Sequence, residues 1–256
     1  MSWSGNRLRL MRFSKWAIVF LSLACLIFMA VTVYGANVGN FVVGIKEADD
    51  RGDAKIMLSD RADYSSPTPL LTAKGLPEMA DCSKETLGDD YTLIEGIGAK
   101  NDTLLRRYMA FSFFLMNVGT EVVDISYVVT LFDDAKAVHR VLRFWIIENN
   151  PDSIIFNHNE VYAYERDLNN PEEAAEQAAY EAAIGGAIYK TKNFKDQSNP
   201  KNIVVCREKH TTLAPGNVIK YTVAIWLEGY EPRCNNELIG AKLKATMTFT
   251  AEIPEE

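Results

Sequence analysis

Residues 108–156 read YMAFSFFLMNVGTEVVDISYVVTLFDDAKAVHRVLRFWIIENNPDSIIF, and this stretch decides the fold class. It holds four runs rich in aromatic and β-branched residues, at 108–116, 122–132, 138–147 and 153–156. Polar sequences (Asn-Val-Gly, Asp-Asp and Asn-Asn-Pro-Asp) separate the runs. Aromatic and β-branched runs favour strands, and the polar residues between them favour turns. The stretch therefore predicts four consecutive antiparallel strands.

Three more strands are predicted downstream, at 203–206, 217–227 and 241–250. The last run alternates between apolar and polar residues, so one face would lie in the core and the other in water. Its inward residues would be Leu243, Ala245, Met247 and Phe249. Because many strands follow one another without a βαβ pattern, we expect a mainly β fold, a jelly-roll-like antiparallel β-sandwich.

One segment between the predicted strands has the features of a helix instead. Asn170 and Pro171 open a stretch rich in Ala and Glu that ends at Ile184, just before Gly185. Asn is a favoured N-cap, Pro suits the first helical position, and glycine suits the position after a helix. We therefore expect an α-helix inside an insertion at about 165–200, carried on a loop of the sandwich.

The chain before these strands is less regular. Apolar runs at 41–45 and 55–58 flank the charged turn 49–53 and predict a hairpin. Residues 59–102 are rich in Pro, Gly, Ser and Asp, so we expect mostly irregular structure there. The Arg-Gly-Asp tripeptide at 51–53 matches an integrin-type adhesion motif, but a charged hairpin tip explains the same residues without a receptor.

An apolar run at 16–36 stands apart from the rest of the sequence. About 20 apolar residues span a hydrocarbon core of about 30 Å, so this run is long enough to cross a bilayer. Basic residues before a span favour the cytoplasmic side, so we expect one pass with residues 1–15 in the cytoplasm and 37–256 outside. The lipid bilayer would then be a partner through 16–36. The cations that carry this prediction are Arg7, Arg9, Arg12 and Lys15.

The same run also fits a cleavable signal peptide, because small residues stand at Gly35 and Ala36. Its apolar core is longer than such peptides usually have, and Tyr34 interrupts the small-residue pattern before a cleavage point. The sequence favours an anchor in the cell membrane, with secretion after cleavage as the alternative.

The overall charge limits the partners. The chain has 256 residues, a formal net charge of -7 and a pI near 5.2. Nucleic-acid binding needs clustered basic residues, so nucleic acid is not an expected partner. We expect a protein partner, or self-association through a sheet edge.

Three cysteines lie in the part of the chain that we expect to be exported. Cys206 and Cys234 flank the same predicted strand, so they are the best candidates for a disulfide. Cys82 would then be a thiol or would pair between chains. Spacing does not fix the pairing, and three unpaired thiols are the alternative.

The usual catalytic motifs are absent: there is no Gly-x-Ser-x-Gly elbow, no phosphate-binding glycine loop and no His-Glu-x-x-His helix. The histidines His139, His158 and His210 lie far apart, and the segment around His158 and Glu160 is the best local candidate for a metal or acid–base role. A solvated loop histidine explains it equally well. We therefore expect no catalytic residue, no metal ligand and no cofactor.

Two residue sets have both a functional and a structural interpretation. An acidic group suits calcium by residue type but lacks EF-hand spacing, so solvated turns are favoured. Its members are Asp49, Asp50, Asp53, Asp60 and Asp63. Aromatic residues in the predicted strands suit stacking on carbohydrate, although core packing is the simpler account. These are Phe111, Phe113, Phe114, Phe144, Trp145, Tyr221 and Trp226.

The C-terminal part also resembles a known family. The likeness is carried by 213–216 (LAPG), 226–229 (WLEG), Cys234, 111–119 (FSFFLMNVG) and the opening strand 41–45. These features are similar to TasA/camelysin-like exported β-sandwich proteins of Gram-positive bacteria. The resemblance implies a surface or extracellular-matrix protein, in some members one that polymerises by donating a strand to a neighbour. It also brings a peptidase label from camelysin, for which this sequence offers no zinc motif.

The sequence thus predicts a membrane-anchored or exported surface protein without enzymatic activity, with a structural or binding role in the envelope or matrix. Two alternatives stay open. One is an exported metal-dependent peptidase of the camelysin type. The other is a secreted matrix subunit that donates residues 37–46 to a neighbouring sheet.

Overall fold

The computed structural model describes residues 40–46, 55–61, 63–74, 79–87, 98–101, 107–132, 136–149, 156–185, 189–199 and 201–254. Contacts divide the chain into Met1–Val38 and Gly39–Glu256, and the described residues all belong to the second unit. Among these residues, none of the helices is both long and apolar enough to cross a membrane. The span expected at 16–36 lies outside the described residues.

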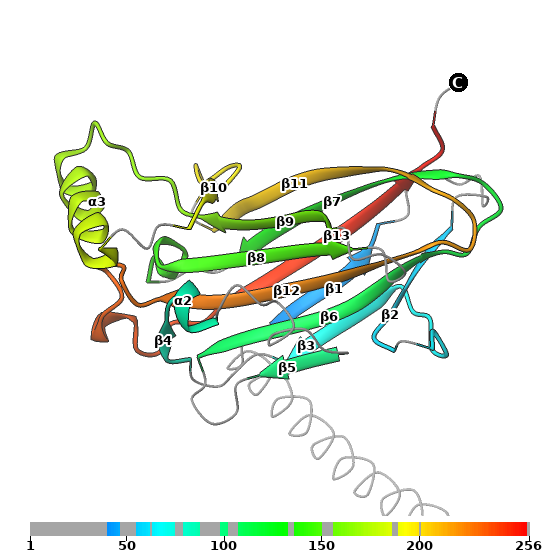
Figure 1. The fold of residues 1–256 in the computed structure, drawn as a ribbon, viewed down its shortest axis with the longest axis horizontal. Helices are drawn as coiled ribbons and strands as arrows, with labels where there is room; N and C mark the ends of the chain where they lie inside the picture. Colours follow the sequence, from blue (N-terminus) through cyan, green and yellow to red (C-terminus); the bar gives the residue numbers. More distant parts are fainter. Residues whose placement is uncertain are drawn as a thin grey trace, which may run out of the picture. The chain divides into compact units, whose positions relative to one another are not determined.

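The described residues form two β-sheets, labelled in Figure 1. The smaller sheet has the strand order β11 (Asn202–Leu213), β7 (Val123–Phe132), β13 (Lys244–Glu252), β1 (Asn40–Ile45) and β3 (Leu70–Lys74). The larger sheet has the order β10 (Thr191–Asn193), β9 (Phe156–Ala163), β8 (Leu142–Asn149), β12 (Val218–Glu228), β6 (Tyr108–Asn117) and β2 (Ile56–Ser59). In addition, β4 (Asp81–Cys82) pairs with β12, and β5 (Gly98–Asn101) pairs with β6.

Helices contribute little to this unit. Those among the described residues are α2 (Lys84–Leu87), α3 (Pro171–Ile184) and the 3-10 turns η2 (Val138–Arg140) and η3 (Asn236–Leu238). The prediction of a mainly β, sandwich-like fold is therefore confirmed.

Aromatic side chains from both sheets meet in the main core. Phe113 of β6 packs on Tyr221 of β12 and on Phe249 of β13, with ring centroids 5.6 and 6.0 Å apart. Phe41 of β1 packs edge-on against Phe111 at 6.3 Å. Edge-to-face and offset contacts of this kind add to the burial of apolar surface. The core therefore ties β1 and β13 to the larger sheet.

The two sheets differ in how their faces are buried. In the smaller sheet, β7 and β13 alternate buried and half-buried residues, as predicted for β13. In the larger sheet, β6 and β8 are buried almost continuously. A second apolar cluster covers part of the outer face there, and it joins Trp145 and Trp226 to Cys82 and Leu87. Strands covered on both faces appear in sequence as uninterrupted apolar runs.

Part of the predicted strand pairing is wrong. β6 and β7 were expected to be neighbours, as were β7 and β8, but in each case the two strands lie in different sheets. The fourth predicted strand, 153–156, meets the described residues only at Phe156, where β9 begins, and β9 pairs with β8 in antiparallel order. Packed sheets lie about 10 Å apart, which the connections at 118–122 and 133–141 are long enough to cross.

The hairpin predicted at 41–58 is also wrong. β1 lies between β13, to which it is parallel, and β3, to which it is antiparallel. β2 pairs with β6 in the other sheet. Phe41 and Val43 are fully buried, whereas an isolated two-stranded hairpin would leave such residues exposed. The turn residues 49–53 lie outside the described residues.

Residues 59–102 hold more structure than their composition predicts. They contain β3, β4, β5 and α2, and each of the strands pairs with a longer strand elsewhere. Downstream, β11 extends beyond the predicted 203–206 to Leu213. Short segments whose pairing partners are distant in sequence lack the local pattern from which we predicted the other strands.

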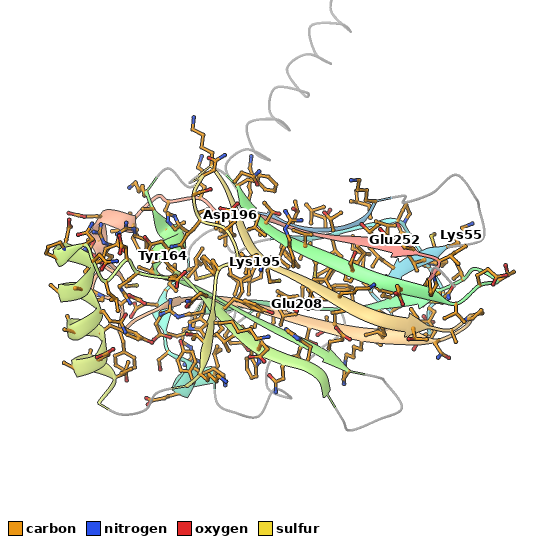
Figure 2. The ribbon with its side chains drawn as sticks, turned by 90° about the horizontal axis from the view of Figure 1, so that it is seen from above. Lys55, Tyr164, Lys195, Asp196, Glu208 and Glu252 are labelled. Atoms are coloured by element: carbon orange, nitrogen blue, oxygen red, sulfur yellow. The ribbon has the colours of Figure 1, made fainter. Side chains whose placement is uncertain are left out.

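Backbone bridges join the edges of the two sheets. Leu58 and Thr68 exchange hydrogen bonds of 2.9 and 2.8 Å beside β2 and β3. Asp196 and Val204 do the same at 3.0 and 2.7 Å beside β10 and β11. The backbone groups at these positions are therefore not available to pair with a strand from another molecule. Figure 2 labels Asp196 and shows Lys55 at the end of the sandwich opposite α3.

Candidate functional site: an arginine cluster beneath α3

Helix α3 has the caps that the sequence predicts. The Asn170 side chain accepts a hydrogen bond from the Glu172 N–H at 3.0 Å, and Pro171 is the first helical residue. Gly185 follows the helix with a φ of 58°, a left-handed conformation that suits glycine. The helix connects β9 to β10, which pair in parallel and therefore need a crossover between them.

Two buried guanidinium groups share one buried carboxylate next to α3. Arg143 of β8 and Arg166, in the loop before α3, each donate a hydrogen bond to Glu231. Arg143 is only 2% exposed and Glu231 only 4%. Arg143 also donates to the carbonyl of Leu142 at 3.1 Å. Because a buried ion is costly unless it is paired, these side chains depend on one another.

A second carboxylate extends this group inward. The Tyr189 hydroxyl accepts from Arg143 Nε at 3.3 Å and donates to Glu228 Oε2 at 2.5 Å. The Trp226 indole N–H donates to the same oxygen at 3.2 Å. Burial raises the pKa of the Tyr189 hydroxyl, which therefore keeps its proton and acts as a donor. The other oxygen, Glu228 Oε1, is buried and receives no hydrogen bond from the described residues.

The first turns of α3 supply carboxylates to two more arginines. Arg140 of η2 donates to Glu173 at 2.7 Å. Arg233, in the loop after β12, donates to Glu176 at 2.6 Å and to Glu172 at 3.0 Å. Charge-assisted hydrogen bonds of this kind are stronger than neutral ones. The term arginine cluster is used below for these four residues: Arg140, Arg143, Arg166 and Arg233.

Glu173 is the most enclosed glutamate of α3, at 6% exposure. It also accepts hydrogen bonds from the Asp167 N–H at 2.7 Å and from the Tyr164 hydroxyl at 3.2 Å. Burial disfavours its charge, but the Asp167 N–H and the Arg140 guanidinium outweigh burial, so the pKa of Glu173 lies below its ordinary value. Figure 2 shows Tyr164 toward the α3 end of the sandwich.

The face of α3 that contacts the sandwich is mainly polar. Besides its glutamates, the helix presents Gln177, which accepts from Arg166 at 2.6 Å. The Tyr180 ring lies 5.6 Å from the Arg143 guanidinium and 5.5 Å from that of Arg166. Among the apolar side chains of the helix, only Ile184 is buried. Charged and cation–π contacts therefore hold α3, rather than an apolar stripe.

A different polar cluster lies between the two sheets. Tyr162 of β9 donates to Glu208 of β11 at 2.6 Å and lies 3.0 Å from His158 Nε2. The Tyr127 hydroxyl is buried and has no hydrogen-bond partner among the described residues. Burial raises the pKa of both tyrosines, so they are neutral. Tyr127, His158, Tyr162 and Glu208 are named the tyrosine cluster below.

The histidines do not form a metal site among the described residues. His158 lies on β9 rather than in a solvated loop. Its ring stacks on Tyr162, and burial lowers the pKa of His158. His139 is buried at η2 against Tyr164. Within the described ranges, no three His, Cys, Asp or Glu side chains are placed to hold a metal ion. The zinc of a camelysin-type peptidase thus has no donor set in this part of the chain. His210 lies on β11.

The predicted disulfide is not formed in the structure. Cys206 and Cys234 are both thiols. They belong to segments of different sheets, because Cys206 lies on β11 and Cys234 follows β12. Burial raises the pKa of Cys206 to about 12 and that of Cys234 to about 11, so neither is a reactive thiolate. Cys82 lies in the second apolar cluster, with its sulfur 3.4 Å from the Arg107 carbonyl.

The other predicted candidates divide into two groups. Asp49, Asp50 and the tripeptide 51–53 lie outside the described residues. Asp60 is exposed, and Asp63 accepts from the Ser65 N–H at 3.1 Å, as in a polar turn. The aromatic set is buried, so core packing explains it and carbohydrate stacking does not. That set is Phe111, Phe113, Phe114, Phe144, Trp145, Tyr221 and Trp226.

Sequence reasoning missed the arginine cluster. Its members come from β8, η2 and two loops, so no local spacing brings them together. One signal was available: α3 has glutamates in its first turn and no basic residue in its last. A helix without cations at i+4 from its glutamates leaves those carboxylates available to cations from another segment.

Comparisons of this chain with protein-family models, with curated proteins and with solved structures found no match. The functional proposal below therefore rests on the sequence and geometry of the chain itself.

Proposed function

We propose that this protein is a surface-exposed, non-catalytic β-sandwich that residues 16–36 hold at the cell membrane. Its role would be structural or binding, in the envelope or the extracellular matrix. The jelly-roll-like strand order and the TasA/camelysin-like relationship belong to the same proposal. The alternative is an exported metal-dependent peptidase of the camelysin type.

Strand β1 is the observation that carries this proposal. It begins at Asn40, so three residues separate it from the end of the apolar run at Ala36. It is also an interior strand of its sheet, with Phe41 and Val43 fully buried. The folded domain therefore starts almost directly after the apolar run. Such continuity suits a single-pass protein whose whole exported part is one domain.

The first test asks whether the apolar run is retained. The full-length protein is produced in a Gram-positive host, and the membrane and medium fractions are analysed by intact mass and N-terminal sequencing. The proposal predicts a start at Met1 or Ser2, in the membrane fraction. Wild-type protein that begins at Asn37 in the medium would overturn the anchor.

A matched pair of variants sharpens this test. Tyr34→Ala changes residues 34–36 to Ala-Gly-Ala, a small-residue pattern that signal peptidase accepts. We expect this variant to move to the medium with Asn37 as its first residue. Tyr34→Phe keeps a large ring at the position and should stay in the membrane fraction.

A secreted subunit that donates β1 to a neighbour is the second candidate function. The specific observation in its favour is that β1, the first strand among the described residues, is hydrogen-bonded on both sides, to β13 and to β3. A neighbour's sheet could make the same bonds. Bridges at Leu58 and Asp196 occupy backbone positions at two of the sheet edges.

A cross-link distinguishes the two candidates. Val42 and Thr246 are register partners on β1 and β13. In a Val42→Cys/Thr246→Cys variant, a disulfide within one chain gives a monomer on a non-reducing gel. Strand donation gives a ladder instead. The single variant Val42→Cys is the control for cross-links through the native cysteines.

A further inference from the structure

The attachment of α3 to the sandwich is unusual in its chemistry. A helix that only had to cover the sandwich would bury an apolar stripe. Here the contact residues are Glu172, Glu173 and Glu176, and Ile184 is the one buried apolar side chain of the helix. Replacing such ion pairs by apolar contacts often stabilises a protein, so stability alone does not explain an ionic interface.

The sandwich beneath α3 is complete without the helix. β9 and β10 pair directly through Val161 and Thr191, and the Phe194 N–H donates to the Ala163 carbonyl at 2.8 Å. Removal of α3 from the surface therefore breaks no bond of the ladder between the two strands. The crossover can open while the sheet stays intact.

Release of α3 would uncover a cationic surface. Arg140 and Arg233 have carboxylate partners on the helix, and Arg166 has Gln177 together with Glu176 at 3.9 Å. Arg143 and Arg166 keep Glu231. The surface would then present four guanidinium groups against two carboxylates, Glu228 and Glu231, in a chain whose formal net charge is -7.

The contacts of α3 also show which ligand this surface selects. Arg233 reaches Glu172 and Glu176, which are one helical turn apart. Arg140 reaches Glu173 at 2.7 Å and Glu176 at 4.0 Å. Guanidinium groups bind carboxylates through planar, paired hydrogen bonds. The surface therefore fits carboxylates repeated at i and i+4 along a helix.

We propose that the arginine cluster binds an acidic helical segment of a partner protein, and that residues 172–176 of α3 occupy this surface in the free protein. The inference rests on the proposed binding role and gives it a partner chemistry. α3 is then a ligand in cis, and a partner with the same carboxylate spacing displaces it.

The test uses the purified full-length protein in detergent. The probe is a labelled peptide with the sequence of residues 170–185, NPEEAAEQAAYEAAIG, and binding is followed by fluorescence anisotropy. In Glu172→Gln/Glu173→Gln/Glu176→Gln protein, the cis ligand loses its charge. We expect this variant to bind the peptide at least tenfold more tightly than the wild type does. Hydrogen exchange of residues 171–184 should be faster in the same variant.

Two controls make the result specific. Glu181→Gln changes a glutamate of the same helix that contacts Gln177 and no arginine of the cluster in the structure, so it should behave like the wild type. Adding Arg140→Gln and Arg233→Gln to the triple variant should abolish the gain. A peptide with Gln at the three positions that correspond to Glu172, Glu173 and Glu176 should not bind.

The outcomes are decisive in either direction. A triple variant that binds no more tightly than the wild type, or whose α3 exchanges at the wild-type rate, would overturn the proposal. If the triple variant does not fold, Glu172→Gln replaces it, because the Glu172 side chain is largely exposed and, among the described residues, pairs with Arg233. It should give a smaller gain of the same sign, and no gain would again overturn the proposal. Failure here leaves the membrane fractionation result untouched, so the two proposals fail separately.

Discussion

The arginine cluster and the tyrosine cluster solve the same problem in different ways. Both place polar groups away from water, where unpaired groups are costly. Beneath α3 the groups are ions, and Arg143 and Arg166 share one carboxylate, Glu231. Between the sheets the donors are neutral tyrosines, and the Tyr127 hydroxyl has no partner among the described residues. The arginine cluster thus depends mainly on ion pairs, whereas the tyrosine cluster depends on hydrogen bonds from neutral hydroxyl groups.

The largest expected effect comes from removing the shared carboxylate. Glu231→Ala leaves Arg143, which is 2% exposed, and Arg166 without their common counter-ion. Breaking a buried ion pair by deleting one partner costs about 3–5 kcal/mol. We expect a loss of this size in the free energy of unfolding, measured with urea. Glu237→Ala, an exposed change in the same loop, is the control and should cost less than about 0.5 kcal/mol. Equal losses in both variants would contradict the dependence of the cluster on Glu231.

Removing one hydroxyl or the other from the tyrosine cluster should change the free energy of unfolding in different directions. Tyr162→Phe removes the donor to Glu208 and the contact with His158, and should lower the free energy of unfolding by about 1–2 kcal/mol. Tyr127→Phe removes a hydroxyl that has no partner in the part of the chain that the structure describes, so the protein should be unchanged or gain roughly 1 kcal/mol. Both changes keep the ring, so urea unfolding of the two variants isolates the hydroxyls. A similar loss in both would show that Tyr127 is also bonded.

The smaller sheet could be predicted from sequence further than the larger one. In β13, Ala245, Met247 and Phe249 alternate with polar residues, because only one face of the strand is buried. In β8, residues 142–148 are all buried. The apolar run therefore does not indicate which side of the strand faces the main core or which strand pairs with it. Alternation reveals which side of a strand faces the core, and strands buried on both sides lack it.

Pairing between strands that are distant in the chain could not be predicted from the sequence, for a different reason. β1 pairs with β13, more than two hundred residues away, while the nearby β2 belongs to the other sheet. Local turn signals favour neighbouring strands, and this bias produced the wrong hairpin. The arginine cluster was missed for the same reason. α3, in contrast, was predictable to the residue, because Asn170, Pro171 and Gly185 act locally.

The N-cap of α3 gives the next expected effect. Asn170→Ala removes the acceptor for the Glu172 N–H and should cost about 1 kcal/mol of helix stability. Because α3 is held by its first turns, the loss should appear as faster hydrogen exchange at residues 171–184, with little change in the strands. Asn170→Ser keeps a capping oxygen and should exchange like the wild type. Uniform acceleration over the whole sandwich would show that α3 and the sheets unfold together.

The smallest expected effect is a pH dependence at His158, and it tests whether burial keeps the His158 ring neutral. Burial lowers the pKa of His158 in the folded protein, although the Glu208 carboxylate acts in the opposite direction. The unfolded chain therefore takes up the proton more readily, near its ordinary pKa of about 6.5. The stability that this histidine contributes is present above that value and is lost as the pH falls below it. We expect the free energy of unfolding of the wild type to fall more steeply between pH 7.5 and 5.5 than that of His158→Gln. Parallel curves for the two proteins would mean that the ring is as free to take up a proton in the folded protein as in the unfolded chain.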